Sequence, residues 1–169
     1  MDRPLDKNCD GKINFRIVLY QPEIPANTGN IGRLCLGTNS ELHLIRPIKF
    51  FLNDKYLKRA GLDYWDKVKL FTHNNWAEFV GSDILCNNNN HTIYLCETHS
   101  GKIYTEPKYK QGDIFVFGSE SKGLPSSLLS DDKYQKIYIN MSKEIRSINL
   151  CNSVAIILYE AIRQIEVYL

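Results

Sequence analysis

Three hydrogen-bonding side chains stand within four positions just before an apolar run near the carboxyl end of the chain. The segment reads RSINL, with Arg146, Ser147 and Asn149 ahead of Leu150. A helix that starts here needs one polar side chain, which accepts a hydrogen bond from a backbone N–H of the first turn. Ser147 or Asn149 is enough for that task, so the second polar residue and Arg146 are in surplus. This surplus predicts a binding site at the start of the helix.

A glycine-rich segment, FGSESKGLP, is the second place where chemistry could be done. Gly118 and Gly123 allow a close backbone approach or a positive φ, and Pro125 can open a helix. The backbone N–H groups of such a loop could bind phosphate, but the Walker pattern is missing because Leu124 follows Gly123. Glu120 would repel an anion and would suit a hydroxyl group or a cation. An ordinary strand-to-helix turn explains the segment equally well.

The third segment, PEIPANTGNIGR, combines two prolines and two glycines with several hydrogen-bond donors. Asn27 or Thr28 could cap a helix that runs to about Asn39, and Arg33 would then project from its second turn. Taken singly, Asn27 is better explained as a cap and Arg33 as a solvated charge. The cluster as a whole is better explained as a rigid loop that binds a ligand.

Strand-like and helix-like stretches alternate around these segments. This alternation predicts an α/β fold with a mostly parallel sheet flanked by helices. Ligands usually bind to such sheets where loops leave the carboxyl ends of the strands, and the three segments are loops of that kind. The expected strands are 13–20, 42–46, 68–71, 91–97, 113–118 and 136–141, and the expected helices are 28–39, 54–60, 76–80 and a final one from Leu150.

Length and composition exclude several classes of protein. The 169 residues suit one domain, expected at 13–169 after a disordered leader at 1–12. A net charge of +2 creates no global field, so a polyanion would have to bind a local patch. Five cysteines without C-x-x-C spacing argue against a disulfide framework and a metal site, and for a reducing cytosol. No membrane-spanning run or signal peptide is seen, so we expect a cytoplasmic protein with no membrane partner.

The three segments, in this order, resemble the motifs of the SPOUT class of RNA methyltransferases. The resemblance is carried by LYQPEIPANTGNIGRLC, RAGLDYW, FGSESKGLP and RSINLCNSVAIILYEAIRQ, which extend from about Phe15 to Gln164. It is greatest to the small single-domain branch, often called TrmL or YibK, that 2′-O-methylates the wobble nucleotide of tRNA. The resemblance implies a SPOUT-type α/β fold with a carboxyl-terminal trefoil knot, although knots are rare in proteins.

The resemblance also implies a reaction. A homodimer, with its first and last helices near the interface, would transfer a methyl group from S-adenosylmethionine (SAM) and release S-adenosylhomocysteine. The acceptor would be the ribose 2′-hydroxyl of cytidine or uridine 34 in a tRNA anticodon stem-loop, and no metal is implied. The positions that match the catalytic motifs are Asn27, Arg33, Glu120, Ser147 and Asn149. Those that match the cofactor loops are Cys96, Glu97, Thr98, Gly118, Glu120, Gly123, Ile139, Met141, Ser147 and Leu150.

Three positions depart from the usual motifs. Asn140 replaces a proline of the cofactor loop, which restores a backbone donor, frees φ and predicts a softer loop with lower cofactor affinity. Cys151 replaces a common serine, and Cys96 takes the place of an aliphatic residue. None of these changes removes an expected catalytic group.

Arg33 raises the question of which group accepts the proton of the ribose hydroxyl. A guanidinium has a pKa above about 12, so we expect Arg33 to bind the adjacent phosphate and to stabilise developing alkoxide charge. Two alternatives stay open, namely the same chemistry on another tRNA or rRNA ribose and an RNA- or nucleotide-binding module without catalysis. A Rossmann dehydrogenase is disfavoured, because no G-x-G-x-x-G follows the first strand.

Overall fold

The computed structural model describes residues 15–51, 65–82 and 91–165. Within these residues the strands form one seven-stranded sheet in the order β3-β2-β1-β6-β4-β7-β5, and every neighbouring pair is parallel. The carboxyl ends of all the strands therefore point the same way. The strands are β1 (Arg16–Tyr20), β2 (Glu41–Ile45), β3 (Leu70–His73), β4 (Ile93–Glu97), β5 (Lys102–Ile103), β6 (Ile114–Phe117) and β7 (Gln135–Tyr138).

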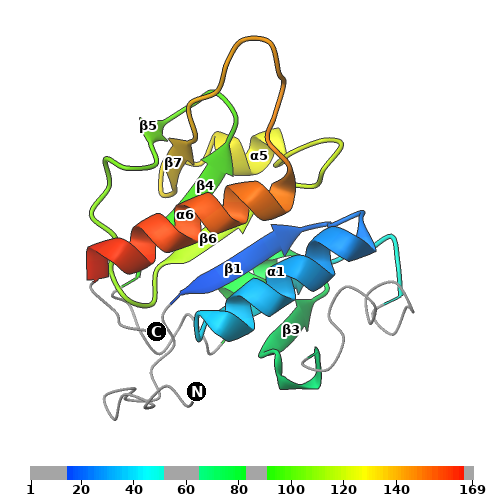
Figure 1. Cartoon of the computed structure of the whole chain (residues 1–169). Coiled ribbons are helices and arrows are strands. Elements are labelled where there is room, and N and C mark those ends of the chain that lie inside the picture. The colour runs from blue at the N-terminus through cyan, green and yellow to red at the C-terminus, as the bar shows by residue number, and fades with distance from the viewer. Residues whose placement is uncertain (1–14, 52–64, 83–90, 166–169) are drawn as a thin grey trace.

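Helices cover both faces of this sheet. Two long helices lie side by side on one face, as Figure 1 shows. Shorter helices pack on the other face, where α3 and α5 contribute Phe79 and Leu128 to the core. The helices are α1 (Pro25–Gly37), α3 (Trp76–Val80), α5 (Ser126–Leu129) and α6 (Leu150–Ile165), with a 3₁₀ turn η1 (Trp65–Lys67).

The core explains why the strands are apolar along their whole length. In β1, the fully buried side chains of Ile17 and Leu19 face α1 and α6, while Val18 faces the opposite layer. Successive strand residues point to opposite sides, so a strand covered on both sides must be apolar at each position. The fold class expected from the sequence is thus confirmed, and the trefoil knot stays a prediction.

Some local expectations were wrong or fall outside the described residues. The first helix begins at Pro25, not near Thr28, because proline fits the first helical position with its fixed φ and missing N–H. The short strand β5 was not expected, since two residues carry no readable period. The strand expected at 136–141 ends at Tyr138. The leader at 1–12 and the helix at 54–60 lie outside the described residues.

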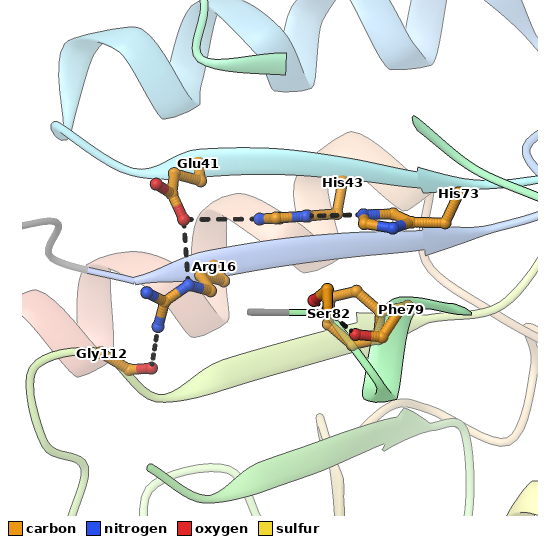
Figure 2. Close-up of polar contacts among 7 residues, drawn as sticks. All are labelled: Arg16, Glu41, His43, His73, Phe79, Ser82 and Gly112. Carbon is orange, nitrogen blue, oxygen red and sulfur yellow. Dashed lines mark hydrogen bonds and ion pairs between the residues drawn. The ribbon is translucent and has the colours of Figure 1, made fainter. Parts of the chain in front are cut away.

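A chain of polar side chains crosses β1, β2 and β3 on the sheet face covered by α3. Figure 2 shows Arg16 Nη1 donating to the carbonyl oxygen of Gly112 at 3.1 Å and Arg16 Nε lying 2.9 Å from Glu41 Oε2. The same Glu41 oxygen lies 3.4 Å from His43 Nε2, and His43 Nδ1 lies 3.0 Å from His73 Nε2. The His43 side chain is fully buried.

These contacts fix the tautomers of the two histidines. A carboxylate only accepts, so His43 Nε2–H donates to Glu41, and His43 Nδ1 then accepts from His73 Nε2–H. Both rings are neutral in this arrangement. Burial lowers the pKa of His43, although Glu41 opposes the shift. Burial, with His43 beside it, also lowers the pKa of His73.

Mild acid should therefore destabilise the fold through this histidine pair. The folded pKa values lie below the ordinary value of 6.5, so the unfolded chain takes up protons at a higher pH than the folded chain. The stability that the neutral pair contributes is complete above about pH 6.5 and is lost as the pH falls below it. We expect the Tm from circular dichroism to drop by a few degrees between pH 7 and pH 5.5.

The double substitution His43→Leu/His73→Leu should flatten this dependence, whatever it does to the absolute Tm. Replacing the exposed His99 with glutamine is the matched control and should leave the dependence unchanged. An equally steep fall in Tm for the double variant would contradict the assignment.

Candidate functional site

A cavity of about 910 Å³ lies where β4, β6 and β7 end. Its volume is in the range of roughly 300–1,000 Å³ that is usual for cofactor sites. Most of its lining comes from four stretches: the start of α1, the end of β4, the loop after β6, and the segment from the end of β7 into α6. The three segments singled out in the sequence thus contribute to one cavity at the carboxyl edge of the sheet.

The loop after β6 is a tight turn that requires glycine at both ends. Ser119 and Gly123 exchange backbone hydrogen bonds of 3.2 and 2.9 Å, and Gly123 has a φ of +69°. A Cβ added to Gly118 would lie 2.1 Å from the carbonyl carbon of Gly123, where no side chain fits. The two glycines therefore fix the shape of this wall of the cavity.

Glu120, in the same loop, binds the amino end of α1. Its carboxylate accepts hydrogen bonds from the backbone N–H groups of Glu23 at 2.9 Å and Ile24 at 3.3 Å. Ile24 is the N-cap residue of α1 and supplies no side-chain cap of its own, while Pro25 has no N–H. Glu120 takes over the capping role from another loop, with its negative charge at the positive end of the helix. The expectation that Asn27 or Thr28 caps this helix was wrong, because the helix begins at Pro25 and both residues lie inside it.

Asn27 joins the three segments through its side-chain amide. Its Nδ2 donates to Glu120 Oε1 at 2.9 Å, and its Oδ1 accepts from Asn149 Nδ2 at 3.3 Å. Asn149 in turn caps α6, because its Oδ1 accepts from the backbone N–H of Cys151 at 2.9 Å. The Cys151 thiol donates to the Asn27 carbonyl oxygen at 3.2 Å. Asn149, Asn27 and Glu120 thus form a continuous chain across the rim of the cavity.

The structure brings together all the expected site residues except one. Arg33 does not line the cavity and is exposed on the third turn of α1, not on the second turn as expected. It follows Pro25 by eight residues, which places it about 12 Å farther along the helix axis. The expected residues that line the cavity are Asn27, Cys96, Glu97, Thr98, Gly118, Glu120, Gly123, Ile139, Met141, Ser147, Asn149 and Leu150.

Several lining residues had not been singled out in the sequence. Ser119 and Ser121 belong to the FGSESKGLP segment, so membership of that loop is a signal that could have found them. The remaining additions have no distinctive sequence pattern, and only the fold shows that they line the cavity. They are the polar Ser153 and the apolar Ile24, Phe117, Leu124, Leu129, Ile148 and Ile157.

The walls of the cavity combine apolar, acidic and basic groups. Burial raises the pKa of the half-buried Glu97, while Lys122 and Arg146 are exposed at the rim. SAM carries a sulfonium, an amino group, a carboxylate and an adenine ring, so this mixture and the cavity volume fit it. Within the described ranges, no three histidine, cysteine or acidic side chains cluster in a way that could hold a metal. In the same ranges no helix has the length and apolarity needed to span a membrane.

Residues 14–159 match the sequence pattern of the SpoU rRNA Methylase family. The chain belongs to this family. A relative from Listeria monocytogenes is 48% identical to this chain over 151 residues. The aligned part covers 88% of this chain and 86% of the relative. A Methylovorus glucosotrophus relative, named tRNA (cytidine(34)-2′-O)-methyltransferase, is 42% identical and is aligned over 89% of this chain and 95% of its own length.

Solved structures agree with this membership. One is described as giving structural insights into the 2-OH methylation of C/U34 on tRNA. It is 38% identical to this SpoU member, with a TM-score of 0.83 and coverage of 90% of this chain and 96% of that chain. The SpoU methyltransferase AviRb from Streptomyces viridochromogenes with AdoMet has a TM-score of 0.78 at 20% identity, covering 92% of this chain and 62% of its own, which shows a shared fold. The expected SPOUT-class methyltransferase is confirmed.

Proposed function

We propose that this SpoU family member transfers a methyl group from SAM to the ribose 2′-hydroxyl of nucleotide 34, cytidine or uridine, in tRNA. The observation that carries the proposal is the meeting of Asn27, Glu120 and Asn149 at the rim of a cavity of cofactor size. The names of the Methylovorus relative and of the solved structure at 38% identity support the same substrate.

The residues that would hold SAM lie mostly in loops and would bind it largely through their backbone groups. When bound there, SAM supplies a methyl group on a positively charged sulfur. The chain's task is then to orient the ribose hydroxyl, which in well-aligned cases lowers a barrier by about 7–11 kcal/mol. The holding residues would be Cys96, Glu97 and Thr98 at the end of β4, Gly118 and Gly123 after β6, and Ile139, Met141, Ser147 and Leu150 toward α6.

Glu120 and Ser147 have different tasks in this proposal. Glu120 accepts three N–H hydrogen bonds from the α1 segment, so its carboxylate serves to hold Asn27 and the helix start in place. Ser147 lines the cavity and is exposed, so its hydroxyl can donate to the ribose. Arg33 binds the phosphate next to the target ribose and stabilises the alkoxide that develops there.

We further propose a cytoplasmic homodimer that binds the anticodon stem-loop. The α1 and α6 helices lie side by side on one face of the sheet and leave Tyr159 of α6 half exposed and Ile24, next to α1, 44% exposed. Apolar groups on two neighbouring helices suit an interface between copies. A second subunit would also enlarge the surface that a short chain offers to RNA.

Nucleoside mass spectrometry of tRNA transcripts after incubation with the protein and SAM tests the function. We expect 2′-O-methylcytidine or 2′-O-methyluridine at position 34 only. A transcript with a 2′-deoxyribose at position 34 is the matched control and should accept no methyl group. A methylated product at another ribose would show that position 34 is not the target. If the folded protein binds SAM or RNA but transfers no methyl group, it is a binding module and not an enzyme.

A further inference from the structure

The carboxylate of Glu23 lies between three loops and touches the cavity wall from outside. Glu23 Oε2 accepts a hydrogen bond from the backbone N–H of Ser121 at 3.0 Å, and Oε1 forms an ion pair with Lys49, which follows β2. The side chain of Glu23 is only 14% exposed, whereas that of Lys49 is 64% exposed. Glu23 itself does not line the cavity, but Ser121 does.

Glu23 and Glu120 form a reciprocal pair. Glu120 accepts the backbone N–H of Glu23, while Glu23 accepts the backbone N–H of Ser121, the residue after Glu120. Each loop therefore binds the other through a carboxylate and a backbone donor. Two such bonds in opposite directions resist both sliding and rotation of the loop after β6 relative to the start of α1.

The Glu23 carboxylate is held in its charged form. Hydrogen bonds from Lys49 and Ser121 lower its pKa to about 2. Hydrogen bonds to charged acceptors are about twice as strong as neutral ones. The Glu23 carboxylate is therefore charged at neutral pH, where it accepts the hydrogen bond from Ser121 and pairs with Lys49.

We propose that Glu23 is a positioning residue that holds the Ser121–Gly123 part of the cavity wall in its cofactor-binding shape, with Lys49 fixing the direction of its carboxylate. This inference rests on the SAM site proposed above. Glu23 does not line the cavity and acts through Ser121, so it affects cofactor affinity and not the methyl transfer step.

Titration calorimetry with SAM and steady-state kinetics test the inference. Glu23→Ala should raise the Kd and KM for SAM by about tenfold or more, while kcat at saturating SAM stays within about threefold. Glu23→Gln keeps an acceptor for Ser121 N–H but loses the charge, so its Kd should lie between those of the wild type and the alanine variant.

Glu78→Ala is the matched control. Glu78 is exposed on α3 and also accepts a backbone N–H, that of Asn74 at 2.8 Å, away from the cavity. Its loss should leave the Kd for SAM unchanged. Lys49→Met alone should weaken SAM binding. Combined with Glu23→Ala it should cause no further loss, because Lys49 acts on SAM affinity only through the Glu23 carboxylate.

The outcomes separate the two proposals. If the wild-type protein binds no SAM, the proposed function fails and the inference falls with it. If the wild type binds SAM and folded Glu23→Ala binds it equally well, the positioning role alone is wrong. If the alanine variant does not fold, Glu23→Gln and Lys49→Met decide the question. Wild-type SAM affinity in both of these variants would overturn the positioning role.

Discussion

Alanine in place of Gly118 should eliminate measurable SAM binding and lower methyl transfer by at least about 100-fold, the scale of effect that a 1 Å misplacement has on a reaction. The new Cβ would lie 2.1 Å from the carbonyl carbon of Gly123 and 2.3 Å from the backbone nitrogen of Leu124. Both atoms belong to the backbone, so the loop itself must move. That movement opens the Ser119–Gly123 turn, which forms a wall of the cavity.

Titration calorimetry with SAM and a tritium-transfer assay on tRNA measure this loss, and circular dichroism checks that the sheet stays folded. Gly37→Ala is the control, because a Cβ on Gly37 meets nothing within 4 Å and the residue ends α1 in a helical conformation. It should keep wild-type SAM affinity and gain about 0.5–1 kcal/mol of stability. Normal SAM binding by Gly118→Ala would show that this loop is not the cofactor wall.

The sheet could be predicted from the sequence because its signal is local. Each strand is covered on both faces, so it appears as a short apolar run such as Ile17–Leu19, and the alternation with helices then favours parallel pairing. The same local reasoning failed at the start of α1. The cap there is the carboxylate of Glu120, which lies 96 residues from Ile24 in the chain, and no spacing rule connects two such positions.

The candidate site was accessible to prediction through topology. Loops that leave the carboxyl ends of parallel strands meet at one edge, so three unusual loops were expected to converge, and Asn27, Glu120 and Asn149 do form one hydrogen-bonded chain. The surplus of polar groups in RSINL has a partly structural explanation, because Asn149 both caps α6 and binds Asn27. Arg146 and Ser147 are the remaining surplus, and both line the cavity.

Contacts between loops that carry no sequence motif could not be predicted from the sequence. Glu23 stands in a segment that was singled out, but its role depends on Lys49 and Ser121, which come from two other loops. The buried pair of His43 and His73 was likewise invisible, because each histidine alone fits a strand and only the register of β2 with β3 brings their rings together.

Arg33→Ala should lower the rate of methyl transfer by about 10²–10³-fold, the usual loss when one group that stabilises developing negative charge is removed. SAM affinity should not change, because Arg33 does not line the cavity. Arg33→Lys keeps the charge but not the planar fork that binds phosphate with two hydrogen bonds, so it should recover only part of the rate. Single-turnover kinetics at saturating SAM measure these rates, and full activity of the lysine variant would show that the fork is not needed.

The position of Arg33 also predicts which subunit it serves. It lies about 12 Å along α1 from Pro25, on an exposed part of the helix that we place near the dimer interface. We therefore expect Arg33 to act on the ribose bound at the partner's cavity. Mixing Arg33→Ala and Gly118→Ala subunits should then restore about one quarter of the wild-type activity, because half of the randomly formed dimers are mixed and each of these has one intact site. If Arg33 instead served its own subunit, every site in the mixture would lack one component and no activity would return.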